Sequence, residues 1–211
     1  MNKQYAIFDL DGTLVDSMKY WKDLTKEYLN IKGIYDIPEE IFKLIKPMTM
    51  TESASLFIER FGIEGTPESV AKEMNDLMDM HYYNDIPLKK GVKEYLEELR
   101  KAGTTMCVAS ATAIPLVEGC LSRLGILDYF SFVLSCETNG RGKDHPDIYL
   151  EAAEKMGAKP EAIAVYEDAL YAAETAKKAG FYVIGVFDEN SEKKFDRLKE
   201  ISDEVILVYQ K

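Results

Sequence analysis

Tyr5-Ala6-Ile7-Phe8-Asp9-Leu10-Asp11-Gly12-Thr13 combines a short apolar run with an acidic turn, and it points to the architecture of the whole chain. The first four residues are aromatic or aliphatic, which is typical of a buried strand. The Asp-Gly pair that follows is a turn signal. We therefore expect a buried strand that runs directly into a loop carrying two carboxylates.

Short apolar runs also alternate with helical patterns along the rest of the chain. The runs occupy residues 106–109, 132–134, 163–166, 182–186 and 205–208. Helical patterns lie near residues 92–100, 116–124, 147–156 and 169–179. Strands that alternate with helices in this way form a parallel sheet covered on both faces. The predicted fold class is therefore α/β with a parallel sheet core.

One block of the sequence has only helical periods. It spans residues 16–85, where apolar side chains recur at helical spacing, for example Tyr20, Leu24 and Tyr28. Because the block lies between the first two expected strands, the sheet domain is discontinuous. We expect residues 1–15 and 86–211 to form the sheet core and residues 16–85 to form an inserted helical cap.

The composition is that of a globular protein with an acidic charge balance. The 211 residues are 46% hydrophobic and 30% charged, and 26 basic against 37 acidic side chains give a net charge of −11. Lys and Arg do not cluster with interleaved aromatic residues, so the electrostatic features of a nucleic-acid-binding protein are missing. Nucleic acid is not an expected partner.

The cysteines and the first residues bear on the compartment. Cys107, Cys120 and Cys136 are odd in number and lack a C-x-x-C spacing, which suits buried thiols better than disulfides or a zinc site. Asp9 and Asp11 interrupt the first apolar run before it could serve as a signal peptide or a membrane span. We expect a cytoplasmic protein without a membrane partner.

Polar residues follow the ends of three expected strands. Asp9 and Asp11 follow the first, Ser110 the second, and the pair Glu167-Asp168 a later one, while Lys143 lies in a loop before a helix. In an open parallel sheet the ligand site lies at the carboxyl ends of the strands. Two carboxylates about 4 Å apart repel by about 4 kcal/mol at an effective dielectric constant of about 20. Converging carboxylates therefore need a proton or a cation, and an all-oxygen set suits Mg²⁺.

These residue types point to phosphoryl chemistry. An Asp beside Mg²⁺ stays ionised and can attack an electrophile whose charge the metal neutralises. Lys143 would supply a compact positive charge, and Ser110 and the backbone N–H groups of the Gly12 turn can donate to phosphate oxygens. The expected partner is a small phosphorylated molecule.

Four segments resemble, in order, the signatures of the haloacid dehalogenase-like superfamily. They are Asp9-Leu10-Asp11-Gly12-Thr13, Ser110 after its apolar run, Gly142-Lys143-Asp144-His145-Pro146-Asp147-Ile148-Tyr149, and Tyr166-Glu167-Asp168-Ala169. The helical insert resembles the C1-type cap of the branch that contains phosphoglycolate phosphatase and β-phosphoglucomutase. The resemblance implies a Rossmann-like core and a Mg²⁺-dependent phosphatase acting on a small phosphorylated metabolite, for which we favour a monomer.

The resemblance also implies a role for each matching position. Asp9 is the expected nucleophile, which forms an aspartyl phosphate, and Asp11 the general acid and base. Mg²⁺ would be held by Asp9, the backbone carbonyl of Asp11, Asp168 and Glu167, with the choice between the last two left open. The expected phosphate-binding residues are Gly12, Thr13, Ser110, Ala111 and Lys143.

Several departures from the mutase pattern favour a phosphatase. Thr13 replaces the usual Val or Ile, Ala113 and Ile114 replace a Lys-Asn pair, and Met50 replaces the arginine that would bind a second phosphate. Lys46, Met48 and Met50 are the expected specificity residues of the cap. Asp144 stands where the third signature usually has proline, which leaves the loop conformation around Lys143 open. A sugar-phosphate mutase and an inactive binding module remain as alternatives.

Each of these residues also has a purely structural interpretation. The Asp-Gly turn could be only a turn, and Ser110 could cap a helix. Glu167 and Asp168 could favour the N-terminus of the next helix, and Lys143 could be a surface lysine. Asp16 and Ser17 are expected to cap the first helix of the insert, with the lining of the site entrance as the alternative.

Overall fold

The structure is a computed structural model that describes residues 3–45, 48, 50–139 and 141–209. The chain divides into two compact units. Unit 1 comprises Met1–Met18 and Ile86–Lys211, and unit 2 comprises Lys19–Asp85. Each unit has its own buried apolar core.

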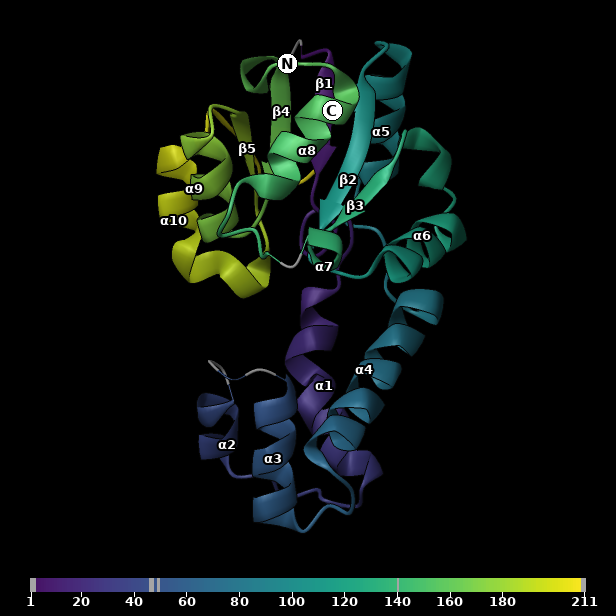
Figure 1. Cartoon of the computed structure of the whole chain (residues 1–211), viewed down its shortest axis with the longest axis vertical. Helices are drawn as coiled ribbons and strands as arrows, with labels where there is room; N and C mark the ends of the chain where they lie inside the picture. The colour runs from purple at the N-terminus through teal and green to yellow at the C-terminus, as the bar shows by residue number, and fades with distance from the viewer. Residues whose placement is uncertain (1–2, 46–47, 49, 140, 210–211) are drawn as a thin grey trace. The chain divides into compact units, whose positions relative to one another are not determined.

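Unit 1 is a parallel α/β sheet domain (Figure 1). Its strands are β1 (Tyr5–Phe8), β2 (Thr105–Ser110), β3 (Val133–Ser135), β4 (Ile163–Glu167), β5 (Tyr182–Val186) and β6 (Glu204–Ile206). The spatial order is β3-β2-β1-β4-β5-β6, and each neighbouring pair is parallel. This order confirms the predicted fold class and is that of a doubly wound Rossmann-like sheet.

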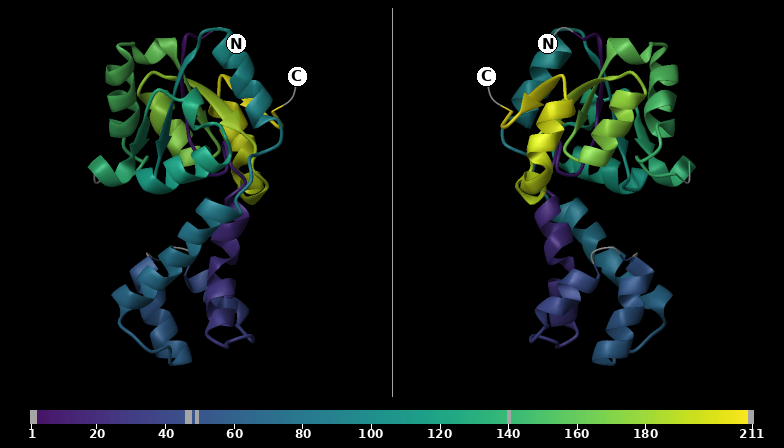
Figure 2. Two further views of the ribbon diagram at one scale, coloured as in Figure 1. Left: turned by 90° about the vertical axis from the view of Figure 1, so that its right-hand side faces the viewer. Right: turned by 90° about the vertical axis from the view of Figure 1, so that its left-hand side faces the viewer.

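The helices of unit 1 cover both faces of the sheet. They are α5 (Val92–Lys101), α6 (Ile114–Arg123), α7 (Cys136–Asn139), α8 (Asp147–Met156), α9 (Leu170–Lys178) and α10 (Glu192–Ile201), with short 3₁₀ turns at Leu127–Tyr129, Pro160–Ala162 and Glu189–Ser191. Figure 2 shows α5, in teal, and α8, in green, on opposite sides of the sheet. Such double coverage explains why the strands are continuous apolar runs.

The central strand β1 anchors the core. Ala6, Ile7 and Phe8 are fully buried, and burial of a side chain such as Ile or Phe contributes about 1.5–3 kcal/mol. The pairing of β1 with β4 places Phe8 opposite Tyr166, and their rings stack with centroids 4.0 Å apart. β1 is therefore held rigidly beside β4, and the residues after the two strands start from fixed positions.

Unit 2 is all-helical. It contains α2 (Glu39–Leu44), α3 (Met50–Phe61), α4 (Pro67–Asn84) and all of α1 (Met18–Ile31) beyond its first residue. A capping box between Thr66 and Ser69 starts α4. Buried side chains from α1, α3 and α4 build its core, among them Leu24, Tyr28, Phe57, Met74 and Met78.

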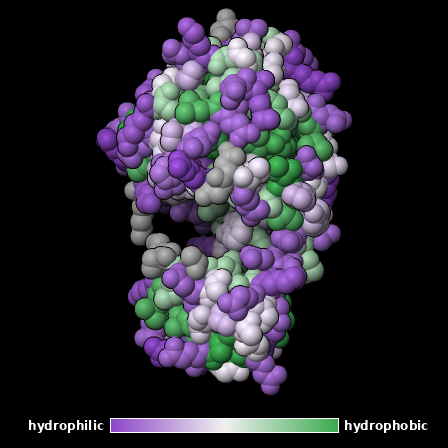
Figure 3. Space-filling model, in the orientation of Figure 1, coloured by the Kyte–Doolittle hydropathy of each residue, from purple (hydrophilic) through white to green (hydrophobic). Residues whose placement is uncertain are grey.

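The surface is mainly polar. In Figure 3, hydrophilic residues cover much of the visible face and hydrophobic ones form separate patches between them, as expected for a chain of net charge −11. No helix in the described part of the chain is both long and apolar enough to traverse a lipid bilayer.

Candidate active site

The order of the strands reverses between β1 and β4, and the candidate site lies at their carboxyl ends. The Asp9 N–H donates to the Tyr166 carbonyl at 3.0 Å, so the β1–β4 pairing extends one residue beyond β1. Asp9 follows β1 directly, Glu167 is the last residue of β4, and Asp168 comes next. Ligands of open α/β sheets bind at such a reversal point.

A tight turn after β1 brings the first signature against Asp168. The N–H groups of Leu14 and Val15 both donate to the Leu10 carbonyl, at 2.9 and 3.0 Å. Gly12 has a φ of +80°, and a Cβ added there would lie 2.5 Å from Asp168 Oδ2. Only glycine fits this conformation and this close approach without displacing the Asp168 carboxylate.

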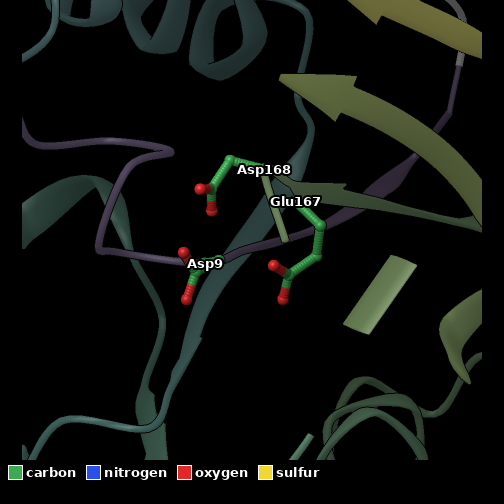
Figure 4. Close-up of side chains that lie close together, drawn as sticks. All are labelled: Asp9, Glu167 and Asp168. Atoms are coloured by element: carbon green, nitrogen blue, oxygen red, sulfur yellow. The ribbon is translucent and has the colours of Figure 1, made fainter. Parts of the chain in front are cut away.

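Three carboxylates converge at this point (Figure 4). Asp9, Glu167 and Asp168 each offer an oxygen, and these oxygens all lie within 4.8 Å of one another. The three residues are only 6%, 1% and 5% exposed. The structure therefore brings together acidic residues that the sequence places in two distant segments.

Lys143 lies within this group. Its Nζ contacts Asp9 and donates to Glu167 Oε1 at 2.6 Å, and the residue is 4% exposed. Burial by itself lowers the pKa of Lys143, but the charges of Asp9 and Glu167 outweigh it and raise that pKa above the usual value of lysine. The loop that contains Asp144 thus delivers a stable ammonium group to the carboxylates.

One ammonium does not balance three buried carboxylates. Burial raises the pKa of Asp9 to about 7, with Lys143 opposing the shift and Glu167 and Asp11 adding to it. Burial, followed by the charges of Asp9 and Glu167, also raises the pKa of Asp168 well above its usual value. Further positive charge would therefore stabilise the ionised forms of these carboxylates.

The donor set fits a divalent cation of the Mg²⁺ type. All of its ligand atoms are carboxylate oxygens, which hard cations prefer. Glu167 Oε2 is buried and has no hydrogen-bond partner within the described residues. An orphaned buried carboxylate oxygen is costly, and coordination to a metal ion would satisfy it.

The Asp11 carboxylate is not part of this group. Ser17 Oγ donates to its Oδ1 at 2.6 Å and Thr112 Oγ1 donates to its Oδ2 at 2.7 Å. The Thr112 N–H donates to Ser110 Oγ at 3.0 Å. The loop after β2 therefore meets the loop after β1, and Asp11 is held by hydroxyl groups.

The remaining predicted residues have diverse surroundings. Thr13 is buried and its hydroxyl lies 3.4 Å from Asp168 Oδ1, while Ala111 is exposed. Met48 and Met50 are half-buried in unit 2. Lys46 lies outside the described residues.

Three residues at the site were not expected from the sequence: Tyr149, Thr112 and Lys89. The Tyr149 hydroxyl donates to Glu167 Oε1 at 2.7 Å, and the ring is fully buried. A buried tyrosine on the apolar side of a helix needs a partner for its hydroxyl. This need is the one feature of the sequence that could have indicated a role for Tyr149. It could not indicate which residue the partner would be.

Lys89 links the loop after β1 to the loop after β5. Its Nζ donates to the Gly12 carbonyl at 2.6 Å, to the Phe187 carbonyl at 2.8 Å and to Asp188 Oδ2 at 2.9 Å. The side chains of Lys89 and Asp188 are 16% and 3% exposed. We call these four residues the Lys89 clamp.

Similarity to known proteins supports the resemblance that the four sequence signatures indicate. A sequence model described as haloacid dehalogenase-like hydrolase matches residues 6–186. A solved structure of a conserved haloacid dehalogenase-like protein from Agrobacterium tumefaciens superimposes with a TM-score of 0.75 at 27% identity, covering 99% of this chain and 95% of that one.

Two relatives of similar sequence have different activities in their names. The fructose-1-phosphate phosphatase YqaB of Escherichia coli K12 is 27% identical over 192 residues, which cover 88% of this chain and 98% of the relative. The β-phosphoglucomutase of Bacillus subtilis is 28% identical over 195 residues, which cover 86% and 82%. Both match nearly the full length of the chain.

Proposed function

Since this chain belongs to the haloacid dehalogenase-like hydrolase family, we propose that it is a Mg²⁺-dependent phosphatase that hydrolyses a small phosphorylated metabolite through a phosphorylated Asp9. The observation that carries this proposal is the buried group of Asp9, Glu167 and Asp168 with Lys143 in contact. A nucleophilic carboxylate, a cation site and an ammonium lie together at the reversal point of the sheet.

In the first half of the reaction, an oxygen of Asp9 attacks the phosphorus atom. The bond from phosphorus to the leaving oxygen breaks as the bond to Asp9 forms, and Asp11 gives the leaving oxygen its proton. The two hydroxyls on Asp11 keep its carboxyl group apart from the acidic group. Asp11 can therefore exchange protons without serving as a ligand through its side chain.

In the second half, water attacks the phosphorus of the aspartyl phosphate. Asp11 takes a proton from that water, the bond between phosphorus and Asp9 breaks, and inorganic phosphate leaves. Lys143, the Ser110 hydroxyl and the backbone N–H group of Ala111 bind the phosphoryl oxygens in this proposal. Such donors stabilise the charge that develops in the transition state. The N–H groups of Gly12 and Thr13, which the sequence suggested for this role, donate instead to the Val15 and Leu10 carbonyls at 3.0 and 3.3 Å.

The cation would be held by Asp9, Asp168, Glu167 and the backbone carbonyl of Asp11. When bound, Mg²⁺ neutralises phosphoryl charge and makes phosphorus more electrophilic. The raised pKa values of Asp9 and Asp168 in its absence support this assignment. Both carboxylates must be ionised for the proposed chemistry.

For the substrate we propose a phosphorylated sugar. The support is the name of YqaB, a fructose-1-phosphate phosphatase that matches over nearly its full length. Selection among such sugars is assigned to Lys46, Met48 and Met50 of unit 2. We also propose a cytoplasmic location, since Cys107, Cys120 and Cys136 are all free and buried.

A sugar-phosphate mutase is the second candidate, favoured by the match to β-phosphoglucomutase. A mutase needs to hold a second phosphate while the first is transferred. The apolar residues Met50, Ala113 and Ile114, which stand where the mutase pattern has Arg, Lys and Asn, offer no cation for that role. A phosphatase remains the better proposal.

The proposal is tested with para-nitrophenyl phosphate and with a panel of sugar phosphates. The reactions of the panel are followed by phosphate release and by ³¹P NMR.

Turnover of para-nitrophenyl phosphate tests the proposed chemistry most simply. We expect activity with Mg²⁺, its loss with EDTA, and a fall in kcat of about 10³-fold or more in Asp9→Asn, because the amide is not a nucleophile. The exposed Asp128 supplies a matched control, and Asp128→Asn should retain wild-type turnover. Metal-independent turnover, or full activity in Asp9→Asn, contradicts the proposal.

The identity of the product separates the two candidate activities. A phosphatase releases inorganic phosphate in amounts equal to the substrate consumed. A mutase instead yields a positional isomer of the sugar phosphate with little free phosphate. A folded protein that is inert toward every ester of the panel would indicate a binding module.

A further inference from the structure

The two carboxylate oxygens of Glu167 have opposite surroundings. Oε1 accepts two hydrogen bonds, from the Tyr149 hydroxyl at 2.7 Å and from Lys143 Nζ at 2.6 Å. Oε2 is buried and has no hydrogen-bond partner among the described residues. Both donors are therefore on one oxygen, and the other is left for a different kind of partner.

Tyr149 is held firmly in the position from which it donates. It lies in the first turn of α8 and is fully buried in the apolar core that α8 shares with strands of the sheet. Its ring packs against Phe181, with centroids 6.0 Å apart. Because the ring is fixed by the core, the direction of the hydroxyl is fixed as well.

The Tyr149 hydroxyl has an effect that Lys143 does not duplicate. The terminal torsion of a Glu side chain is broad and roughly two-fold, so a carboxylate rotates readily unless it is held. Lys143 also contacts Asp9, so its ammonium is shared between two carboxylates. The Tyr149 hydroxyl has only Glu167 as its hydrogen-bond partner in the contacts described for it, and it restricts the rotation of that carboxylate.

We propose that Tyr149 is a positioning residue for the cation, which holds Glu167 by Oε1 so that Oε2 faces the ion shared with Asp9 and Asp168. The inference rests on the proposed function, because it takes this acidic group as the metal site. Groups that orient metal ligands typically change metal affinity 10- to 100-fold when they are removed.

The test is Mg²⁺ binding by the full chain without substrate, measured by isothermal titration calorimetry. Tyr149→Phe removes only the hydroxyl, and we expect it to weaken Mg²⁺ binding by about 10-fold or more. Tyr129→Phe is the matched control, since it removes a hydroxyl that donates to Glu97 at 3.2 Å outside the acidic group. It should bind Mg²⁺ like the wild type.

A double-variant cycle separates positioning from a general loss of stability. In Glu167→Gln the charge of the carboxylate is gone, so adding Tyr149→Phe should weaken Mg²⁺ binding little further. Saturating Mg²⁺ should restore most of the kcat of Tyr149→Phe, because the substitution leaves the reacting groups in place.

The outcomes distinguish the inference from the proposed function. If the wild type binds no Mg²⁺, both are overturned. If the wild type binds Mg²⁺ and Tyr149→Phe binds it equally well, only the inference is overturned. Equal weakening by Tyr149→Phe in the wild-type and Glu167→Gln backgrounds also overturns it, since the effect then does not pass through Glu167.

Discussion

Gly12 and Asp168 show how one backbone position controls the site. Gly12 has a φ of +80°, and an added Cβ would meet Asp168 Oδ2 at 2.5 Å. An L-residue with this φ is strained by about 1–2 kcal/mol before any collision is counted. The collision then falls on a carboxylate of the proposed metal site.

We therefore predict that Gly12→Ala lowers both stability and Mg²⁺ binding. Gly33→Ala is the matched control, because Gly33 has a φ of +85° but no atom within 4 Å of the added Cβ. It should lose about 1–2 kcal/mol of unfolding free energy and keep its activity. Urea unfolding and calorimetry measure the two effects, and wild-type Mg²⁺ affinity in Gly12→Ala would contradict the close approach.

At the residue scale, the sequence predicts acidic residues better than it predicts their supporting hydroxyls. Asp9 and Asp168 follow apolar runs, so strand ends alone indicate that they converge. Ser17, Thr112 and Tyr149 follow no such rule, since the direction of a hydroxyl depends on the local backbone and on packing. Their bonds to Asp11 and Glu167 become visible only in the folded chain.

Among the elements, the Lys89 clamp joins the loop after β1 to the loop after β5. Lys89→Met leaves the buried Asp188 carboxylate without this cation and removes a donor from two carbonyls. Breaking a buried ion pair costs about 3–5 kcal/mol, and we expect a value near the lower end because Lys89 is partly exposed. The measurement is the free energy of unfolding in urea.

Two further variants make this prediction specific. Asp188→Asn in the Lys89→Met background should recover part of the loss, because it removes the unpaired charge. Lys90→Met, at the exposed neighbouring lysine, should change stability by less than about 0.5 kcal/mol. Equal losses in Lys89→Met and Lys90→Met would refute the role of the clamp.

His81 joins two helices of unit 2 and predicts a pH dependence. Its Nδ1 lies 2.7 Å from Asp85 and its Nε2 lies 2.9 Å from Glu27 of α1. Burial alone lowers the pKa of His81, but the two carboxylates outweigh it and raise that pKa above 6.5. The stabilisation is therefore fully present below pH 6.5 and is lost as the pH rises through the folded-state pKa.

We predict that the stability advantage of the wild type over His81→Gln shrinks as the pH rises from about 6 to about 9. Each ion pair is worth up to about 1 kcal/mol, since Glu27 and Asp85 are partly exposed. Trp21, the single tryptophan, lies in unit 2 and reports its unfolding by fluorescence. His145→Gln, at an exposed histidine of unit 1, is the control. An advantage that grows with pH is the opposite result.

The elements also show where sequence patterns are informative. The expected runs at residues 163–166 and 182–186 correspond to β4 and β5 within one residue, because buried parallel strands are continuously apolar. The expected strand at residues 205–208 begins and ends earlier, at Glu204–Ile206, since its pairing with β5 sets the register. Helix α10 was not predicted, because its charged residues conceal an apolar side that is reduced to Phe195, Leu198 and Ile201.

For the whole molecule, the sequence predicts the strands and most of the helices in their order along the chain, together with the helical insert. Periodicity alone does not predict the spatial order β3-β2-β1-β4-β5-β6. That order places β1 beside β4, so two segments more than 150 residues apart supply one site. Long-range pairing of this kind is decided by packing of the complete core, which local patterns do not contain.

The most direct measurement is chemical trapping of the phosphorylated enzyme. The protein is mixed with Mg²⁺ and para-nitrophenyl phosphate, quenched in acid during turnover and treated with borohydride, which reduces an aspartyl phosphate to homoserine. Mass spectrometry of the peptide that contains residues 4–18 should then show homoserine at position 9 and intact aspartate at position 11. Sustained turnover with Asp9 unmodified, or with the modification at another residue, would contradict the role of Asp9 as the nucleophile.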